Sequence, residues 1–215
     1  MVTGQMNEGE QNGPISFKKG ENPVTGAFLL PADVEINAAW KSSSTGQKGL
    51  FGKAKRAKGE DLDLVCIASQ GLGPKFLCWW GDMDPMEDGS LLSHGDDRRG
   101  RGGETIGVKF AALPPFIDRL TWLLVAYKAN VSFGMVNGVK TTVADASKPG
   151  SPLGYFMPDI DANYNCLVIG QGIKRAPDAW AFSEANAMSN IPRGGSDGGR
   201  AAILRVGRAW AEQGL

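Results

Sequence analysis

The fold is decided by residues 61–80, which have the sequence DLDLVCIASQGLGPKFLCWW. Two carboxylates open an apolar run at residues 61–68, which is typical of a buried β-strand. A second apolar run with several aromatic side chains follows at residues 75–80. Glycine punctuates the stretch between them, so this segment predicts two short strands separated by a turn.

Similar short segments recur along the chain. Residues 34–40 begin by alternating apolar and polar side chains, as a half-buried strand does, and residues 120–127 form the most apolar segment, which we expect at the centre of a sheet. In residues 131–143 the pair Asn137-Gly138 separates two apolar runs, which predicts a hairpin with a type I′ turn. A long loop is predicted at residues 81–103. Roughly ten short strands separated by turns indicate a mainly β fold, either a sandwich or a barrel; the remaining strands are predicted at residues 15–17, 105–111, 153–157, 165–170 and 179–182.

The C-terminal segment has a helical pattern instead. Ile203, Val206 and Trp210 are three and four residues apart, so they share one face of an α-helix predicted over residues 199–213. Ser196 or Asp197 is the candidate N-cap. We expect the apolar face to pack on the sheets, with partner binding as the alternative.

Composition and charge exclude several classes of function. The 215 residues include 23 basic and 23 acidic ones, so net charge does not attract nucleic acid or membranes. No apolar run approaches the ~20 residues of a membrane span, and the polar tail at residues 1–14 lacks the apolar core of a signal peptide. We therefore expect a cytoplasmic protein with one domain at residues 15–215.

The cysteines are predicted to be buried free thiols, because Cys66, Cys78 and Cys166 lie among apolar neighbours.

A basic loop is predicted at residues 41–59, which contain six Lys or Arg residues and no acid. A solvated loop is the simplest interpretation, and contact with an anionic partner is the alternative. The candidate contacts are Lys53, Lys55, Arg56 and Lys58. No motif specific for nucleic-acid recognition is present.

The chain lacks the residue combinations on which most catalytic devices depend. His94 is its only histidine, so a serine or cysteine nucleophile would have a single candidate base. There is no G-x-S-x-G elbow and no phosphate-binding P-loop, and the Gly170-Gln171-Gly172 segment is too short for a dinucleotide fingerprint. We therefore predict that the protein is not an enzyme.

Carboxylates are concentrated between residues 61 and 104. Loops rich in Asp and Gly supply the carboxylate and carbonyl oxygens that calcium prefers, because glycine lets the backbone turn its carbonyl groups inward. On composition alone, a polar surface loop is the simpler interpretation. The acidic residues near the two predicted strands are Asp61, Asp63, Asp82, Asp84, Glu87, Asp88, Asp96, Asp97 and Glu104.

The order of these segments resembles the TerD family of tellurium-resistance and stress proteins. The resemblance covers residues 15 to 215, and it depends on the order of several segments, since no single motif is decisive. The matching segments, in order, are DLD at 61–63, DGS at 88–90, HGDD at 94–97, Glu104 before a strand ending in Leu113-Pro114, SFGMVNG at 132–138, the W-x-F segment at 180–182 and Gly198-Gly199.

The resemblance implies a two-sheet β-sandwich with a C-terminal α-helix. It also implies a non-enzymatic protein that binds calcium through its acidic loops and is linked to tellurite resistance and the stress response. The candidate metal ligands that it implies are Asp61, Asp63, Asp88, Asp96, Asp97 and Glu104.

The chain also departs from the family pattern. The GDDE segment of the family is reduced to Gly103-Glu104, and Arg98, Arg99 and Arg101 either repel a divalent cation or pair with the neighbouring aspartates. These departures and the basic loop support an alternative function, a structural subunit such as a decoration or minor protein of a virion or other large assembly. Both functions imply protein partners or self-assembly.

Overall fold

The computed structural model describes residues 18–19, 27–42, 62–95, 103–127, 132–148, 150, 152–158, 160–192 and 199–213. Several sequence-based predictions concern residues outside these ranges. They are the polar tail, residues 43–59 of the basic loop with Lys53, Lys55, Arg56 and Lys58, and the candidate ligands Asp61, Asp96 and Asp97.

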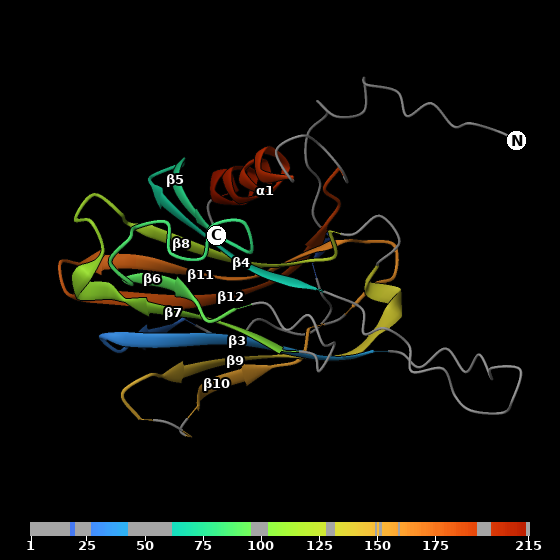
Figure 1. Ribbon diagram of the computed structural model, residues 1–215, viewed down its shortest axis with the longest axis horizontal. Coiled ribbons are helices and arrows are strands. Elements are labelled where there is room, and N and C mark those ends of the chain that lie inside the picture. The colour runs from blue at the N-terminus through green and yellow to red at the C-terminus, as the bar shows by residue number, and fades with distance from the viewer. Residues whose placement is uncertain are drawn as a thin grey trace, which may run out of the picture.

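The chain forms two antiparallel sheets and one helix (Figure 1), which confirms the predicted mainly β sandwich. Sheet A contains, in order, β1 (Lys18–Lys19), β12 (Ala179–Ser189), β11 (Cys166–Ala176), β8 (Arg119–Val125), β4 (Asp63–Gln70) and β5 (Gly73–Cys78), and β2 (Phe28–Leu30) also pairs with β12. Sheet B contains β10 (Pro152–Phe156), β9 (Val136–Asp145), β3 (Asp33–Ser42), β7 (Gly103–Lys109) and β6 (Leu91–Ser93). The helix is α1 (Arg200–Glu212), and short 3-10 turns lie at Phe110–Ala112 and Phe133–Met135.

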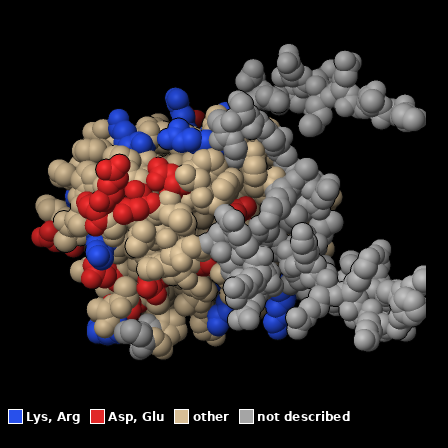
Figure 2. All heavy atoms as spheres, in the orientation of Figure 1, with Lys and Arg blue, Asp and Glu red and all other residues tan. Residues whose placement is uncertain are grey.

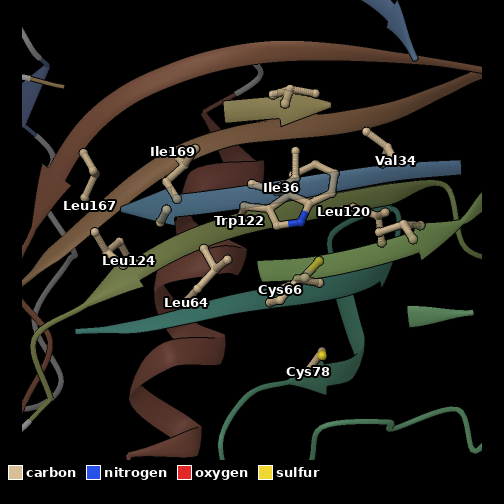
Figure 3. Close-up of a cluster of buried hydrophobic side chains, with 14 of the residues drawn as sticks. Val34, Ile36, Leu64, Cys66, Cys78, Leu120, Trp122, Leu124, Leu167 and Ile169 are labelled. Carbon is tan, nitrogen blue, oxygen red and sulfur yellow. The ribbon is translucent and has the colours of Figure 1, made fainter. Parts of the chain in front are cut away.

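The main core lies between the two sheets (Figure 3). Ile36 of β3 lies beside Trp122 of β8 there, with Leu124 further along β8, and all three side chains are fully buried. Fully burying one large apolar side chain contributes about 1.5–3 kcal/mol relative to leaving it exposed. This layer therefore fixes how sheet A faces sheet B, and with it the positions of all polar side chains at the ends of the strands.

The helix α1 packs on the face of sheet A that points away from sheet B (Figure 1). Its buried side chains include Ile203, Val206 and Trp210, which confirms the predicted apolar face. The helix begins after Gly199, which has φ 83° and provides no side-chain cap, so neither Ser196 nor Asp197 is the N-cap. Among the described residues, no helix has the length and apolar character that a membrane span requires.

The hairpin predicted at Asn137-Gly138 is wrong. β9 continues through both residues and pairs with β3, where Ala39 opposes Lys140 and Lys41 opposes Asn137. Two residues of β9 therefore oppose one of β3, which is a β-bulge, and Gly138 supplies its positive φ of 58°. Gly138 does adopt a positive φ, as a type I′ turn would require, but here the positive φ belongs to a bulge within a strand and not to a turn between two strands.

A short strand, β6, lies inside the segment predicted as a long loop. It pairs with β7, with Leu91 opposite Val108 and Ser93 opposite Ile106. The pairing continues one residue further, because the amide of His94 donates a 2.9 Å hydrogen bond to the carbonyl of Thr105. The chain is therefore held beside β7 as far as His94, two residues before the acidic residues 96–97.

Candidate functional site

Glu104 links the two sheets of the sandwich. Its side chain is on the same face of β7 as those of Ile106 and Val108, which lie between the sheets. It is only 6% exposed. Its Oε2 accepts a 2.6 Å hydrogen bond from the backbone amide of Leu64 on β4. Pairing of β4 with β5 begins only at Cys66, so the carboxylate acts as acceptor where β4 has no strand on that side.

Asp63 lies beside Leu64 in sequence but on the other side of sheet A. Successive side chains of a strand point to opposite faces. Leu64 faces the space between the sheets, whereas Val65 faces α1, so Asp63 also projects toward the α1 side. The structure therefore brings Asp63 and Glu104 to the same end of the sandwich, on opposite faces of sheet A.

Asp88 lies at the other end of β7. Its Oδ1 accepts a 2.8 Å hydrogen bond from the amide of Ser90, and the carbonyl of Ser90 accepts one from the amide of Lys109. The Ser90 hydroxyl and amide, with help from the Lys109 ammonium, lower the pKa of the Asp88 carboxyl. Lys109 lies five residues along the extended strand from Glu104, a distance of about 17 Å. The structure therefore does not bring Asp88 together with Glu104.

The chain segments that carry the remaining candidate ligands lead to the Glu104 end. Asp61 directly precedes Leu62, which is buried where β4 begins. Asp96 directly follows Gly95. The residue before Gly95 is His94, whose amide is hydrogen bonded to the carbonyl of Thr105. Asp61, Asp96 and Asp97 themselves lie outside the described ranges. Within those ranges, no three His, Cys, Asp or Glu side chains are grouped so that they could hold a metal ion.

The acidic turns before β6 form a surface feature of their own. Figure 2 shows acidic side chains gathered over β6 and the turns before it, with basic side chains along β5 and α1 at their border. The exposed acidic residues include Asp82, Glu87 and Asp88, and the exposed basic ones include Lys75 and Arg208. Because opposite charges adjoin, this face does not present a field of one sign to a distant ion.

The three cysteines are buried free thiols, as predicted. Burial raises the pKa of Cys78 and of Cys166 to about 12, and burial together with the neighbouring Cys78 raises the pKa of Cys66 well above its usual value. The thiolate is the nucleophile and metal ligand of cysteine, and these groups stay protonated near neutral pH. Cys66 and Cys166 pack as small apolar side chains, whereas the thiol of Cys78 donates a 3.3 Å hydrogen bond to the carbonyl of Met83.

Comparison with known proteins shows the fold. No protein-family model matches the chain, and no curated protein sequence is significantly similar to it. A solved structure of SAV2460, a protein of unknown function, is 16% identical with a TM-score of 0.59, over 76% of this chain and 92% of that chain. The solved structure of SCO6318 from Streptomyces coelicolor A3(2), a homologue of the telluride resistance protein TerD, is 18% identical with a TM-score of 0.58, over 77% of this chain and 93% of that chain. This chain therefore has a TerD-like β-sandwich fold.

Proposed function

We propose that this chain is a non-enzymatic binding protein that holds calcium at the end of the sandwich where β4 and β7 begin. The observation that carries the proposal is the convergence of three acid-bearing segments on this end. The hydrogen bond between Leu64 and Glu104 joins the segment that carries Asp61 and Asp63 to β7. The hydrogen bond between His94 and Thr105 joins the segment that leads to Asp96 and Asp97 to β7. The TerD-like fold supports the same assignment.

The proposed ligands are Asp61, Asp96 and Asp97, completed by Asp63 or Glu104. Calcium takes six to eight oxygen ligands, so several carboxylates and backbone carbonyls must contribute. A carboxylate has about four lone-pair sites, so the bond from Leu64 does not exhaust the capacity of Glu104. Because Asp63 and Glu104 face opposite sides of sheet A, we propose that a single ion contacts only one of them.

Thermal unfolding with calcium and with chelator tests the proposal. A ligand that binds only the folded state adds about 2.7 kcal/mol at a hundredfold excess over its Kd. We expect calcium to raise the unfolding temperature, and D96N and D97N to abolish the rise. Comparison of D63N with E104Q identifies the fourth carboxylate.

D88N is the matched control, because it makes the same chemical change at the other end of β7. Its response to calcium should equal that of the unchanged chain. No rise at millimolar calcium, or an equal loss in D88N, contradicts the proposal.

We propose further that the calcium-bound protein acts in tellurite resistance and the stress response, because it shares its fold with the TerD homologue. Expression in a tellurite-sensitive bacterium should raise the tellurite concentration that stops growth, and D96N should remove this effect. An equal benefit from D96N would separate the cellular role from calcium.

A structural subunit of a large assembly is the second candidate function, and the surface of β10 favours it. Leu153 and Tyr155 lie on this edge strand and Met157 follows it, and their side chains are 42%, 67% and 59% exposed. Within the described residues, no strand pairs with the outer side of β10. Exposed apolar edge strands are common sites of association. Light scattering after size exclusion should show oligomers that Y155K disperses; a monomer at all concentrations argues against this function.

A further inference from the structure

Sheet B carries a hollow on the face that points away from sheet A. The hollow has a volume of about 310 Å³ and lies where β3, β6 and β7 meet the turn after β9. Its polar side chains are Asp33, Glu35, His94, Lys109 and Ser147. Lys109 lies at the end of β7 remote from Glu104, whereas His94 lies two residues before Asp96, so one border of the hollow adjoins the segment that leads to the proposed calcium site.

Gly107 makes room for the histidine that borders the hollow. Glu35, Gly107 and Leu92 lie side by side on three adjacent strands. A Cβ atom at position 107 would lie 2.9 Å from Nε2 of His94, closer than real Cβ contacts. The imidazole therefore lies across the strand where a side chain would otherwise project, and its Nε2 is 4.0 Å from Oε1 of Glu35.

Asp33 and Lys109 border the hollow from opposite strands. They are direct partners in the register of β3 and β7, where opposite charges normally attract one another. The ion pairs among the described residues nevertheless do not include one between Asp33 and Lys109. The hollow is therefore bordered by the ammonium group of Lys109 on β7, which also acts on Asp88, and by the carboxylates of Asp33 and Glu35 on the adjacent strand β3.

We propose that this hollow binds a small zwitterion of the α-amino acid class. The ligand ammonium lies against Asp33 and Glu35, and the ligand carboxylate lies against Lys109. Leu92 and Ala146 provide apolar contacts for a short side chain. The volume is at the lower end of the range for ligand sites, which is about 300–1,000 Å³, and this favours a small ligand.

The charges of the hollow discriminate between ligand classes. A simple amine finds its partner carboxylates but also meets the Lys109 ammonium, and a simple carboxylate is repelled by Asp33 and Glu35. A zwitterion places one charge against each group. Only this class uses the whole set of charges at once.

The sole histidine of the chain makes the test direct. His94 gives the only imidazole ring resonances in a proton NMR spectrum, and its Nε2 lies at the hollow. The full chain is titrated with L-alanine, with propionate and with ethylamine, all in the presence of chelator so that calcium plays no part. We expect a saturable shift of the His94 resonances with L-alanine that neither propionate nor ethylamine reproduces.

Charge-neutralising variants complete the test. K109Q should raise the Kd for L-alanine about tenfold, because a charge-assisted hydrogen bond is lost. K140Q is the matched control, because Lys140 lies exposed on β9 of the same sheet and does not line the hollow. D33N provides a second variant if K109Q fails to fold. No saturable shift with L-alanine, an equal shift with propionate or ethylamine, or an unchanged Kd in the folded variant overturns the proposal.

Discussion

The amide of Leu64 and the carboxylate of Glu104 form a 2.6 Å hydrogen bond between the two sheets of the sandwich. Leu64 is 1% exposed and Glu104 is 6% exposed, so water does not compete strongly for either group. A hydrogen bond to an ionised acceptor is roughly twice as strong as a neutral one. The bond therefore fixes the end of β4 where β5 does not yet pair with it.

Removal of this acceptor should destabilise the protein. E104A leaves the buried amide of Leu64 without its acceptor, which costs about 1–3 kcal/mol of unfolding free energy. E104Q retains a neutral oxygen at nearly the same place and should lose less. Urea unfolding measures both variants in the presence of chelator. Equal losses would show that the acceptor oxygen contributes little.

The contact between α1 and sheet A predicts a compensating pair of substitutions. A Cβ at position 207 would collide with Cδ1 of Ile67, so G207A should cost about 1–3 kcal/mol through overpacking. In an I67V background Cδ1 is absent and the collision is relieved. Alanine is favoured over glycine in a helix by about 1 kcal/mol, so G207A should then be neutral or stabilising. A double-mutant cycle by urea unfolding checks this, and additive effects would contradict it.

The bulge in β9 predicts a graded response at position 138. Gly138 has φ 58°, a conformation that costs an L-residue roughly 1–2 kcal/mol. G138A should be destabilising by about that amount, whereas G138N should lose less because asparagine tolerates this region. Thermal unfolding of the two variants measures the difference. If alanine and asparagine behave alike, backbone strain at the bulge is not the cause.

The turn after β9 predicts a dependence of stability on pH. The Ser147 hydroxyl and amide, with Lys148, lower the pKa of Asp145 below its ordinary value of 3.8. The folded state therefore binds this proton less readily than the unfolded state, and the resulting stability is present above pH 3.8 and is lost as the pH falls through the lowered pKa. S147A should reduce the unfolding free energy near neutral pH, with the difference from the unchanged chain shrinking under strong acid. A pH-independent difference would contradict this cause.

The strands with the clearest apolar patterns could be predicted from sequence, and those set by tertiary pairing could not. The core strands β4 and β8 are long apolar runs, and the face of α1 follows from the spacing of Ile203, Val206 and Trp210. β6 has three residues, too few for a period, and exists because β7 lies beside it. Gly138 shows that a positive φ serves a bulge as well as a turn.

The candidate site was predictable only in part, for a similar reason. The resemblance to the TerD family implies that Asp63 and Glu104 belong to one site, and the structure brings them to one end of the sandwich. The faces that they occupy depend on which sheet each strand joins, which no local pattern contains. The hollow on sheet B could not be predicted from the sequence, because Gly107 contributes only the absence of a side chain, which no motif records. The one residue of the hollow to which the sequence points is His94, both as the only candidate base and as part of the HGDD segment at 94–97.

The placement of α1 has a consequence for biosynthesis. The outer face of sheet A presents Val65, Ile67, Leu123 and Val125, and the helix that packs with them follows every strand in sequence. While the ribosome is still translating residues 1–199, this apolar surface has no helix to pack against it. Exposed apolar surface on incomplete chains promotes aggregation. The nascent protein therefore depends on rapid completion of its helix, or on a chaperone, until the surface is closed.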